Sequence, residues 1–247
     1  MPQAPGRELP GVVSFVRRSS RVNPHQRRVL ERLSSKYLIE LPTGELSTSI
    51  APGVEVDWQA EFADTGGGAS PELFVEIGSG TGDALVGAAL AHPTVSFVGF
   101  EVYERAVAST MSKLAAAGIR NVRLVMVDAV QGLDQLFAPA SIARLSIFFP
   151  DPWQKKRHHK RRLVSPAFAQ LATSRLAIGA RWLLATDWPD YAEQMRQVLD
   201  ATPGLINEYA GSGGWAPRPD DRPVTKFEER GLAAGRPVAD LAYRRVA

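Results

Sequence analysis

The sequence predicts an α/β fold in which helices cover both faces of a doubly wound, mostly parallel sheet. Short apolar runs alternate with helical patterns over residues 73–201, which is typical of βαβ units. The chain has 247 residues, 45% of them hydrophobic and 22% charged, which suits one large domain and excludes a disordered chain. A glycine-rich break at residues 66–71 divides the chain. We therefore expect a basic, partly ordered N-terminal extension over 1–65 and the α/β domain over 66–247.

Strands are predicted where short apolar runs stop at turn residues. The first run ends before Gly78, and the fourth ends at Pro150 because proline cannot donate to a strand ladder. We expect strands over 73–77, 95–100, 122–127, 144–149 and 181–186, with weaker strand patterns over 205–209 and 238–245.

Helices are predicted between these strands. Leu85, Ala88 and Ala89 recur at helical spacing, and Gly118 is placed as the C-terminal cap of the second helix. The pair Ser165-Pro166 reads as an N-cap followed by proline at the first helical position. We expect helices over 81–91, 103–117, 165–178 and 191–201.

The composition excludes several kinds of site. The chain has no cysteine, which rules out disulfides, a cysteine-ligated zinc site and a thiol nucleophile, and fits a cytoplasmic protein. No apolar stretch approaches the roughly 20 residues of a transmembrane helix, and Glu8 and Arg17-Arg18 argue against a signal peptide, so we expect no membrane partner. We expect no metal, because the histidines show no paired spacing with acids: His25, His92, His158 and His159.

Acidic residues lie at or directly after successive predicted strands. Glu76 precedes the loop Gly78-Ser79-Gly80-Thr81-Gly82, Glu101 follows the second strand and Asp128 the third. Any one of these acids alone could be a helix cap, and a glycine loop alone could be a plain turn. Together they suit a nucleoside with a ribose and an adenine, such as S-adenosylmethionine. The spacing Gly-x-Gly-x-Gly differs from the dinucleotide fingerprint and argues against a bound pyrophosphate.

Two further acids follow the fourth and fifth strands. Asp151 stands between Pro150 and Pro152, directly before Trp153, in a turn that we expect beside the nucleoside site. A proline-rich turn over a buried tryptophan is the alternative. Asp187 follows the fifth strand and is equally well placed to cap the next helix or to reach the site.

Positive charge is concentrated in two segments. Residues 155–162 carry six fixed positive charges and two histidines, a density that favours a polyanionic partner such as a nucleic acid. Residues 1–40 hold eight lysines or arginines against three acids. A solvated surface is the alternative for both segments.

Five stretches together resemble the bacterial tRNA (guanine-N7-)-methyltransferase family, whose members are class I S-adenosylmethionine-dependent methyltransferases. They are the basic stretch 14–18, the glycine loop 75–82, the long motif 149–162, Thr186-Asp187-Trp188 and the motif 223–231. The glycine loop is shared by many methyltransferases, whereas the motifs at 149–162 and 223–231 are far more particular. The resemblance implies a Rossmann-like sheet of seven strands and methyl transfer from S-adenosylmethionine to N7 of a guanine in the variable region of tRNA.

The resemblance also implies roles for individual residues. Asp151 is expected at the reaction centre. The expected cofactor-binding residues are Glu76, Gly78, Gly80, Gly82, Glu101, Asp128 and Asp151. The expected substrate-binding residues are Lys155, Asp187, Thr225, Lys226, Phe227 and Glu228. The expected contacts to RNA phosphates are Lys156, Arg157, Lys160, Arg161, Arg162, Arg17, Arg18 and Arg21.

Two other functions stay open on the sequence. A methyltransferase acting on a protein or a small molecule would share the glycine loop and Glu101 but would have no use for the basic run. A non-catalytic RNA-binding module would be expected to lose Glu76 or Asp151, and both are present. The oligomeric state is not predicted.

Overall fold

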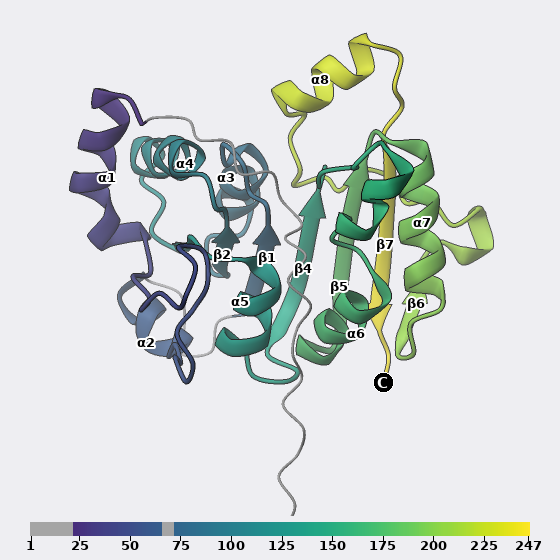
Figure 1. Cartoon of the computed structure of the whole chain (residues 1–247), viewed down its shortest axis with the longest axis horizontal. Helices are drawn as coiled ribbons and strands as arrows, with labels where there is room; N and C mark the ends of the chain where they lie inside the picture. Colours follow the sequence, from purple (N-terminus) through teal and green to yellow (C-terminus); the bar gives the residue numbers. More distant parts are fainter. Residues whose placement is uncertain (1–21, 66–71) are drawn as a thin grey trace, which may run out of the picture.

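One seven-stranded sheet organises the part of the chain that the structure describes, residues 22–65 and 72–247 without the side chains of Lys226, Phe227 and Arg230 (Figure 1). In this computed structural model the strand order is β3-β2-β1-β4-β5-β7-β6. The strands are β1 (Leu73–Ile77), β2 (Ser96–Phe100), β3 (Val122–Val125), β4 (Ile142–Phe148), β5 (Leu176–Thr186), β6 (Leu205–Asn207) and β7 (Ala239–Arg245). Strands β1 to β5 pair in parallel, and β7 runs antiparallel to both β5 and β6. The predicted doubly wound, mostly parallel sheet is confirmed.

Helices pack on both faces of this sheet. Buried residues of α5, α6 and α7 form one core with the inner strands, and buried residues of α1, α3 and α4 form a second core on the other face. Helix α8 lies above the carboxyl ends of β4 and β5 (Figure 1). The α-helices are α1 (Pro24–Tyr37), α2 (Trp58–Phe62), α3 (Asp83–Ala91), α4 (Glu104–Ala116), α5 (Ala129–Leu136), α6 (Pro166–Arg175), α7 (Pro189–Asp200) and α8 (Lys226–Ala233). The short 3₁₀ helices are η1 (Ala63–Thr65), η2 (Lys156–Arg161) and η3 (Ala210–Ser212).

Strand β2 shows why the inner strands read as continuous apolar runs. All five of its residues are buried, with Phe97 in the core beneath α3 and α4 and Val98 and Phe100 in the core beneath α5. Parallel strands covered on both faces have no polar side to alternate with. Helix α5 packs very closely here, because a Cβ added to Gly132 would lie 2.2 Å from the Phe100 ring.

The segment before the glycine-rich break is joined to the domain core. A capping box starts α1, in which the Asn23 side chain accepts from the Gln26 backbone N–H (2.8 Å) and the Gln26 side chain accepts from the Asn23 N–H (3.1 Å). The buried Tyr37 hydroxyl at the end of α1 donates to the Ile119 carbonyl (2.8 Å). The boundary at residue 65 stays a prediction, but α1 contributes side chains to the core that it shares with α3 and α4.

The predicted helix over 165–178 is too long. Helix α6 ends at Arg175, whose Nε donates to the Leu133 carbonyl (2.9 Å), and Leu176 already pairs with Ile142 in the sheet. The strand continues from there to Thr186, with Leu176 opposite Ile142 and Arg181 opposite Arg144 across a register shift. Pairing with β4 overrides the helical spacing of the local sequence.

Helix α5 was not predicted, because its apolar pattern is only two turns long. The helix is specified by Asp128, whose carboxylate accepts from the backbone N–H groups of Val130 and Gln131 (2.9 and 3.2 Å). Across residues 22–65 and 72–247, the helices are all too short or too polar to cross a membrane.

Candidate functional site

A cavity of about 180 Å³ opens at the carboxyl ends of the central strands. Strands β1 and β4 are neighbours although β2 and β3 separate them in the chain, so this is the topological switch point where open α/β sheets bind ligands. The lining residues are Ile77, Gly78, Phe100, Glu101, Val102, Tyr103, Val127, Ala129, Phe148, Phe149, Pro150, Asp151 and Leu163. Three of the predicted site residues, Gly78, Glu101 and Asp151, thus share one cavity.

The glycine loop after β1 takes a backbone that favours glycine at three positions. Gly78, Gly80 and Gly82 have φ of 73°, 54° and 80°. Gly82 is also pressed against α4, since an added Cβ would lie 2.5 Å from Thr110 Cγ2. At Gly78 an added Cβ would meet nothing within 4 Å, so this exposed glycine leaves open space beside the backbone.

Helix α4 holds this loop in place. The Thr110 hydroxyl donates to the Gly80 carbonyl (3.2 Å), and Lys113 Nζ donates to the Thr81 carbonyl (2.8 Å) and to Asp83 Oδ1 (2.5 Å). The backbone N–H groups of the loop are thereby presented in a fixed arrangement. Sequence reasoning missed Thr110 and Lys113, because nothing local marks two helix residues as supports for a loop that lies 30 residues earlier.

Glu101 is the central carboxylate of the cavity. One of its oxygens accepts from the Gly80 N–H (2.8 Å) and the other from the Tyr103 N–H (2.9 Å), so it joins the glycine loop to the start of α4. The pKa of Glu101 is raised, mainly by burial and also by the negative charge of Asp151, although the backbone N–H groups of Tyr103, Gly80 and Val102 lower it. Each carboxylate oxygen keeps a second lone pair for a ligand hydroxyl.

The loop that carries Asp151 is bracketed by two residues in the left-handed region of backbone space. Phe149 has φ of 53° and Trp153 has φ of 44°. Bulky residues adopt this conformation at a cost of roughly 1–3 kcal/mol each, and such strain concentrates at functional sites. The Phe149 N–H donates to the Ala185 carbonyl of β5 (2.8 Å), and Asp151 is exposed at the cavity.

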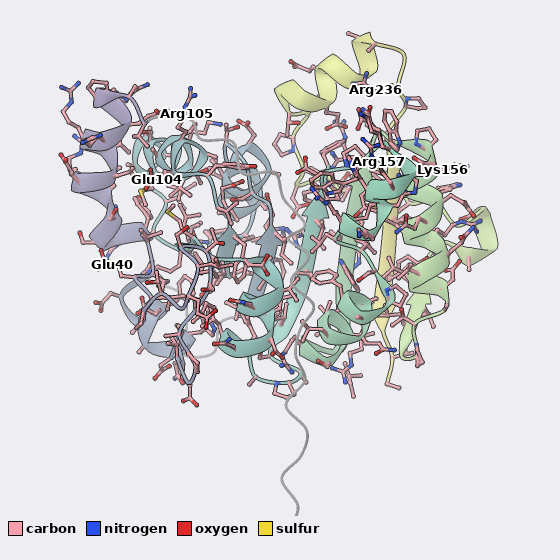
Figure 2. All side chains as sticks on the ribbon, viewed as in Figure 1. Glu40, Glu104, Arg105, Lys156, Arg157 and Arg236 are labelled. Carbon is pink, nitrogen blue, oxygen red and sulfur yellow. The ribbon has the colours of Figure 1, made fainter. Side chains whose placement is uncertain are left out.

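The basic run behind this loop forms η2. Lys155, Lys156, Arg157, Lys160 and Arg161 are exposed. Figure 2 shows Lys156 and Arg157 at the carboxyl edge of the sheet, below Arg236, which follows α8. The predicted phosphate-binding side chains of this run are therefore accessible, with one exception.

The exception is Arg162, and here the prediction is corrected. Arg162 is 4% exposed, and its guanidinium donates to the Pro152 carbonyl (2.8 Å), Gln194 Oε1 (2.7 Å) and Asp190 Oδ2 (2.7 Å). It also lies over the Tyr191 ring at 4.7 Å from the centroid. A guanidinium with all three nitrogens engaged inside the protein is not presented to an RNA phosphate. The predicted phosphate contacts Arg17, Arg18 and Arg21 lie outside the described residues.

Comparison with known proteins agrees with this geometry. A family model described as "Putative methyltransferase" matches residues 70–241. The tRNA (guanine-N(7)-)-methyltransferase of Cutibacterium acnes is 52% identical over 96% of this chain and 84% of its own length. The proteins of the same name from Nocardioides sp. and Thiobacillus denitrificans are 45% and 41% identical, each over 98% of this chain and over 90% and 99% of their own lengths.

The chain belongs to the tRNA (guanine-N(7)-)-methyltransferase family. A more distant likeness concerns the fold alone. The crystal structure of the 16S rRNA methyltransferase KamB superposes with a TM-score of 0.53 at 15% identity, covering 85% of this chain and 100% of that chain.

Two acids that the family resemblance assigns to the cofactor do not line the cavity. Asp128 caps α5 with one carboxylate oxygen, so the alternative reading as a helix cap holds for it. Glu76 is buried within β1, where burial raises its pKa to about 8, the charges of Arg144 and Arg222 lower it and that of Asp221 raises it. Glu76 stands two residues before Gly78, near the end of β1.

The substrate-binding residues predicted for this family gather around α8. Asp187 is buried and its Oδ2 accepts from Nε of the half-exposed Arg236 (2.7 Å). Thr225 starts α8, where its hydroxyl accepts from the Glu228 N–H (3.2 Å). Lys155 is exposed at the start of η2, and the side chains of Lys226 and Phe227 lie outside the described part of the structure.

Glu228 lies in the interior of the protein and not at its surface. It is 3% exposed, and its Oε2 accepts from Arg222 Nη1 (2.9 Å), while Arg222 Nη2 donates to both oxygens of Asp240 (2.9 and 3.1 Å). The Arg222 guanidinium also lies over the rings of Phe148 and Phe149, 5.2 and 5.4 Å from their centroids. Arg222 therefore joins α8 to the strand end that leads to Asp151. The sequence signal for it was its place directly before the motif 223–231.

The residues present fit an S-adenosylmethionine cofactor. The cavity holds two carboxylates, which suits a cationic ligand, and Glu101 has lone pairs for ribose hydroxyls. Its volume is below the roughly 300–1,000 Å³ of most ligand pockets, so a ligand would extend from it along the open glycine loop. The described residues contain no group of three or more histidines, aspartates or glutamates that could hold a metal ion.

The raised pKa of Glu76 predicts a pH dependence of stability. Because the folded-state pKa is about 8 and the ordinary value is 4.5, the fold favours the neutral acid. This stabilisation is fully present below pH 4.5 and is lost as the pH rises through about 8. In Glu76→Gln the group stays neutral, so the free energy of unfolding should fall less steeply over this range than in the wild type, by up to about 1.4 kcal/mol per pH unit.

Urea unfolding of both proteins from pH 5 to pH 9 measures this difference. Other buried acids such as Glu101 and Asp240 titrate in the same direction, and subtracting one curve from the other removes their contribution. Parallel curves would mean that Arg144 and Arg222 keep Glu76 ionised in the folded protein.

Proposed function

We propose that this chain transfers a methyl group from S-adenosylmethionine to N7 of a guanine in the variable region of tRNA. The proposal rests on two features that lie close together in this member of the family. Asp151 lines the cavity, and the exposed cations of η2 begin five residues later in the chain.

The cofactor would be held by three features of the cavity. Glu101 accepts hydrogen bonds from the ribose hydroxyls, the Gly78 backbone permits close approach, and the apolar side chains of Phe100 and Val127 pack against the adenine. S-adenosylmethionine, when bound, supplies a methyl group on a positively charged sulfur. The carboxylates of Glu101 and Asp151 offset this charge, since both face the same cavity.

Methyl transfer to guanine N7 needs no general base. N7 carries a lone pair and no proton, and the bond from sulfur to the methyl carbon breaks as the bond from N7 forms, so the positive charge passes to the base. Catalysis then rests on holding the base in line with the methyl group. Asp151 and Asp187 orient guanine by accepting from its N1–H and N2 amino donors.

The tRNA would be bound mainly through its phosphates. Lys156, Arg157, Lys160 and Arg161 present charge beside the cavity, and phosphate contacts supply most of the affinity of such complexes. The guanine has to leave its stack at a cost of a few kcal/mol, which these contacts offset. The cytoplasmic location inferred from the cysteine-free composition stays a prediction.

Methylation assays test the proposed function. The purified chain with labelled S-adenosylmethionine should label bulk tRNA and leave protein and small-molecule extracts unlabelled. Nucleoside mass spectrometry should identify N7-methylguanosine, and sequencing of digested fragments should map it to the variable region. Label in protein, in small molecules or in another nucleoside would contradict the proposal.

Glu101 should control the affinity for the cofactor. In Glu101→Gln the amide offers one acceptor oxygen and no charge, so S-adenosylmethionine binding should weaken roughly ten- to a hundredfold. Calorimetry in the absence of RNA measures this affinity. Binding of tRNA in the absence of cofactor should not change, and an unaltered cofactor affinity would remove Glu101 from the ribose site.

Asp151 should control turnover more than binding. Asp151→Asn keeps the shape of the side chain but lacks the carboxylate that faces the reacting base, whereas tRNA affinity arises mostly at phosphates. We expect the single-turnover rate at saturating tRNA to fall by roughly a hundredfold, with tRNA affinity changed less than threefold. A near-normal rate would place Asp151 outside the reaction centre.

A further inference from the structure

Arg162 has a role that its place in a basic run conceals. We infer that Arg162 is a positioning residue, which holds the Asp151 loop against α7 and so fixes Asp151 relative to Asp187. This inference rests on the proposed function, because it assigns both carboxylates to the guanine.

The side chain of Arg162 is buried to an extent that sets it apart from its neighbours. Its side chain is 1% exposed, whereas Lys160 and Arg161 are exposed. Arg162 directly follows η2 as its C-terminal cap, and its own N–H donates to the His159 carbonyl (2.9 Å). It is thus the one cation of the described run 155–162 that points into the protein.

Each guanidinium nitrogen of Arg162 has a specific partner. Nε donates to the carbonyl of Pro152, the residue directly after Asp151 (2.8 Å). Nη1 and Nη2 donate to Gln194 and Asp190 in the first turns of α7 (2.7 Å each). The flat face of the guanidinium lies over the ring of the fully buried Tyr191. Lysine cannot make all of these contacts, because it lacks the planar guanidinium group with its several N–H donors.

These contacts lie beyond the pairing of β4 with β5, which ends at Phe148 opposite Ala185 and at the Phe149 N–H. Pro152 follows β4, and α7 begins three residues after β5, with Asp187 between them. The Asp151 loop carries two residues in the left-handed region, Phe149 and Trp153, so its shape needs support from outside. Arg162 supplies that support at the middle of the loop and links it to the helix that follows Asp187.

A phosphate contact and a positioning contact give different results on mutation. Losing a phosphate contact lowers the slope of log affinity against log salt by roughly 0.7 to 0.9. Losing a positioning contact moves a reacting group, and a misplacement near 1 Å costs up to about a hundredfold in rate. Arg162→Met, Arg162→Lys and the matched control Lys160→Met, which removes one exposed charge of the same run, separate the two.

For Arg162→Met we expect the single-turnover rate at saturating tRNA to fall roughly ten- to a hundredfold, with the salt slope of tRNA binding as in the wild type. Arg162→Lys should recover part of the rate, since it keeps the charge and one hydrogen bond. Lys160→Met should show the lower salt slope and weaker tRNA binding. If Arg162→Met does not fold, the comparison is made between Arg162→Lys and the wild type.

A double-mutant cycle with Asp151→Asn distinguishes positioning from a general effect on the fold. If Arg162 acts through Asp151, Arg162→Lys should slow the wild type several-fold and have little further effect in the Asp151→Asn background. Equal effects in both backgrounds, or a lower salt slope with a normal rate, would overturn the inference. An inactive wild type would instead refute the proposed function, so the two failures are distinguishable.

Discussion

The parallel pairing of β1 with β4 is the constraint on which the site depends. It brings strand ends that are far apart in the chain to one edge of the sheet, with Ile77 opposite Ile147. Because parallel strands end on the same side, the acids that follow β2, β4 and β5 all arrive at this edge. The cavity exists only because the order of connection reverses between β1 and β4, which leaves the helices on opposite faces.

Buried arginines hold the loops above this edge. Arg162 joins the Asp151 loop to α7, and Arg222 joins α8 to β7 and packs on Phe148 and Phe149. The half-buried Arg144, near the start of β4 and away from this edge, pairs with Asp221 (2.5 Å) and lies over Phe74. Each has carboxylate partners and an aromatic surface, since an unpaired buried charge would destabilise the fold by several kcal/mol. The same residue type therefore lies in the interior here and at the exposed surface a few residues away.

Opposite charges lie close together in the chain at this site. The carboxylates of Glu101 and Asp151 line the cavity, and the exposed cations of η2 follow Asp151. The separation is local, with Asp151 and Lys155 only four residues apart. The prolines on either side of Asp151, together with the turn into η2, direct the acid inward and the lysines outward.

The sequence by itself determined the fold class, the family and the main strands, and it named three residues that line the cavity, Gly78, Glu101 and Asp151, because apolar runs, glycines and strand-end acids are local signals. It missed α5, whose apolar pattern is only two turns long, and it extended α6 into β5, where pairing with β4 overrides helical spacing. Only the tertiary structure decided which charges face inward. Within residues 155–162 every lysine and arginine looks alike in sequence, and Arg162 differs only because Asp190, Gln194 and the Pro152 carbonyl converge on it from other elements. These partners meet at Arg162 because of how the elements pack, which cannot be read from the order of residues in the chain.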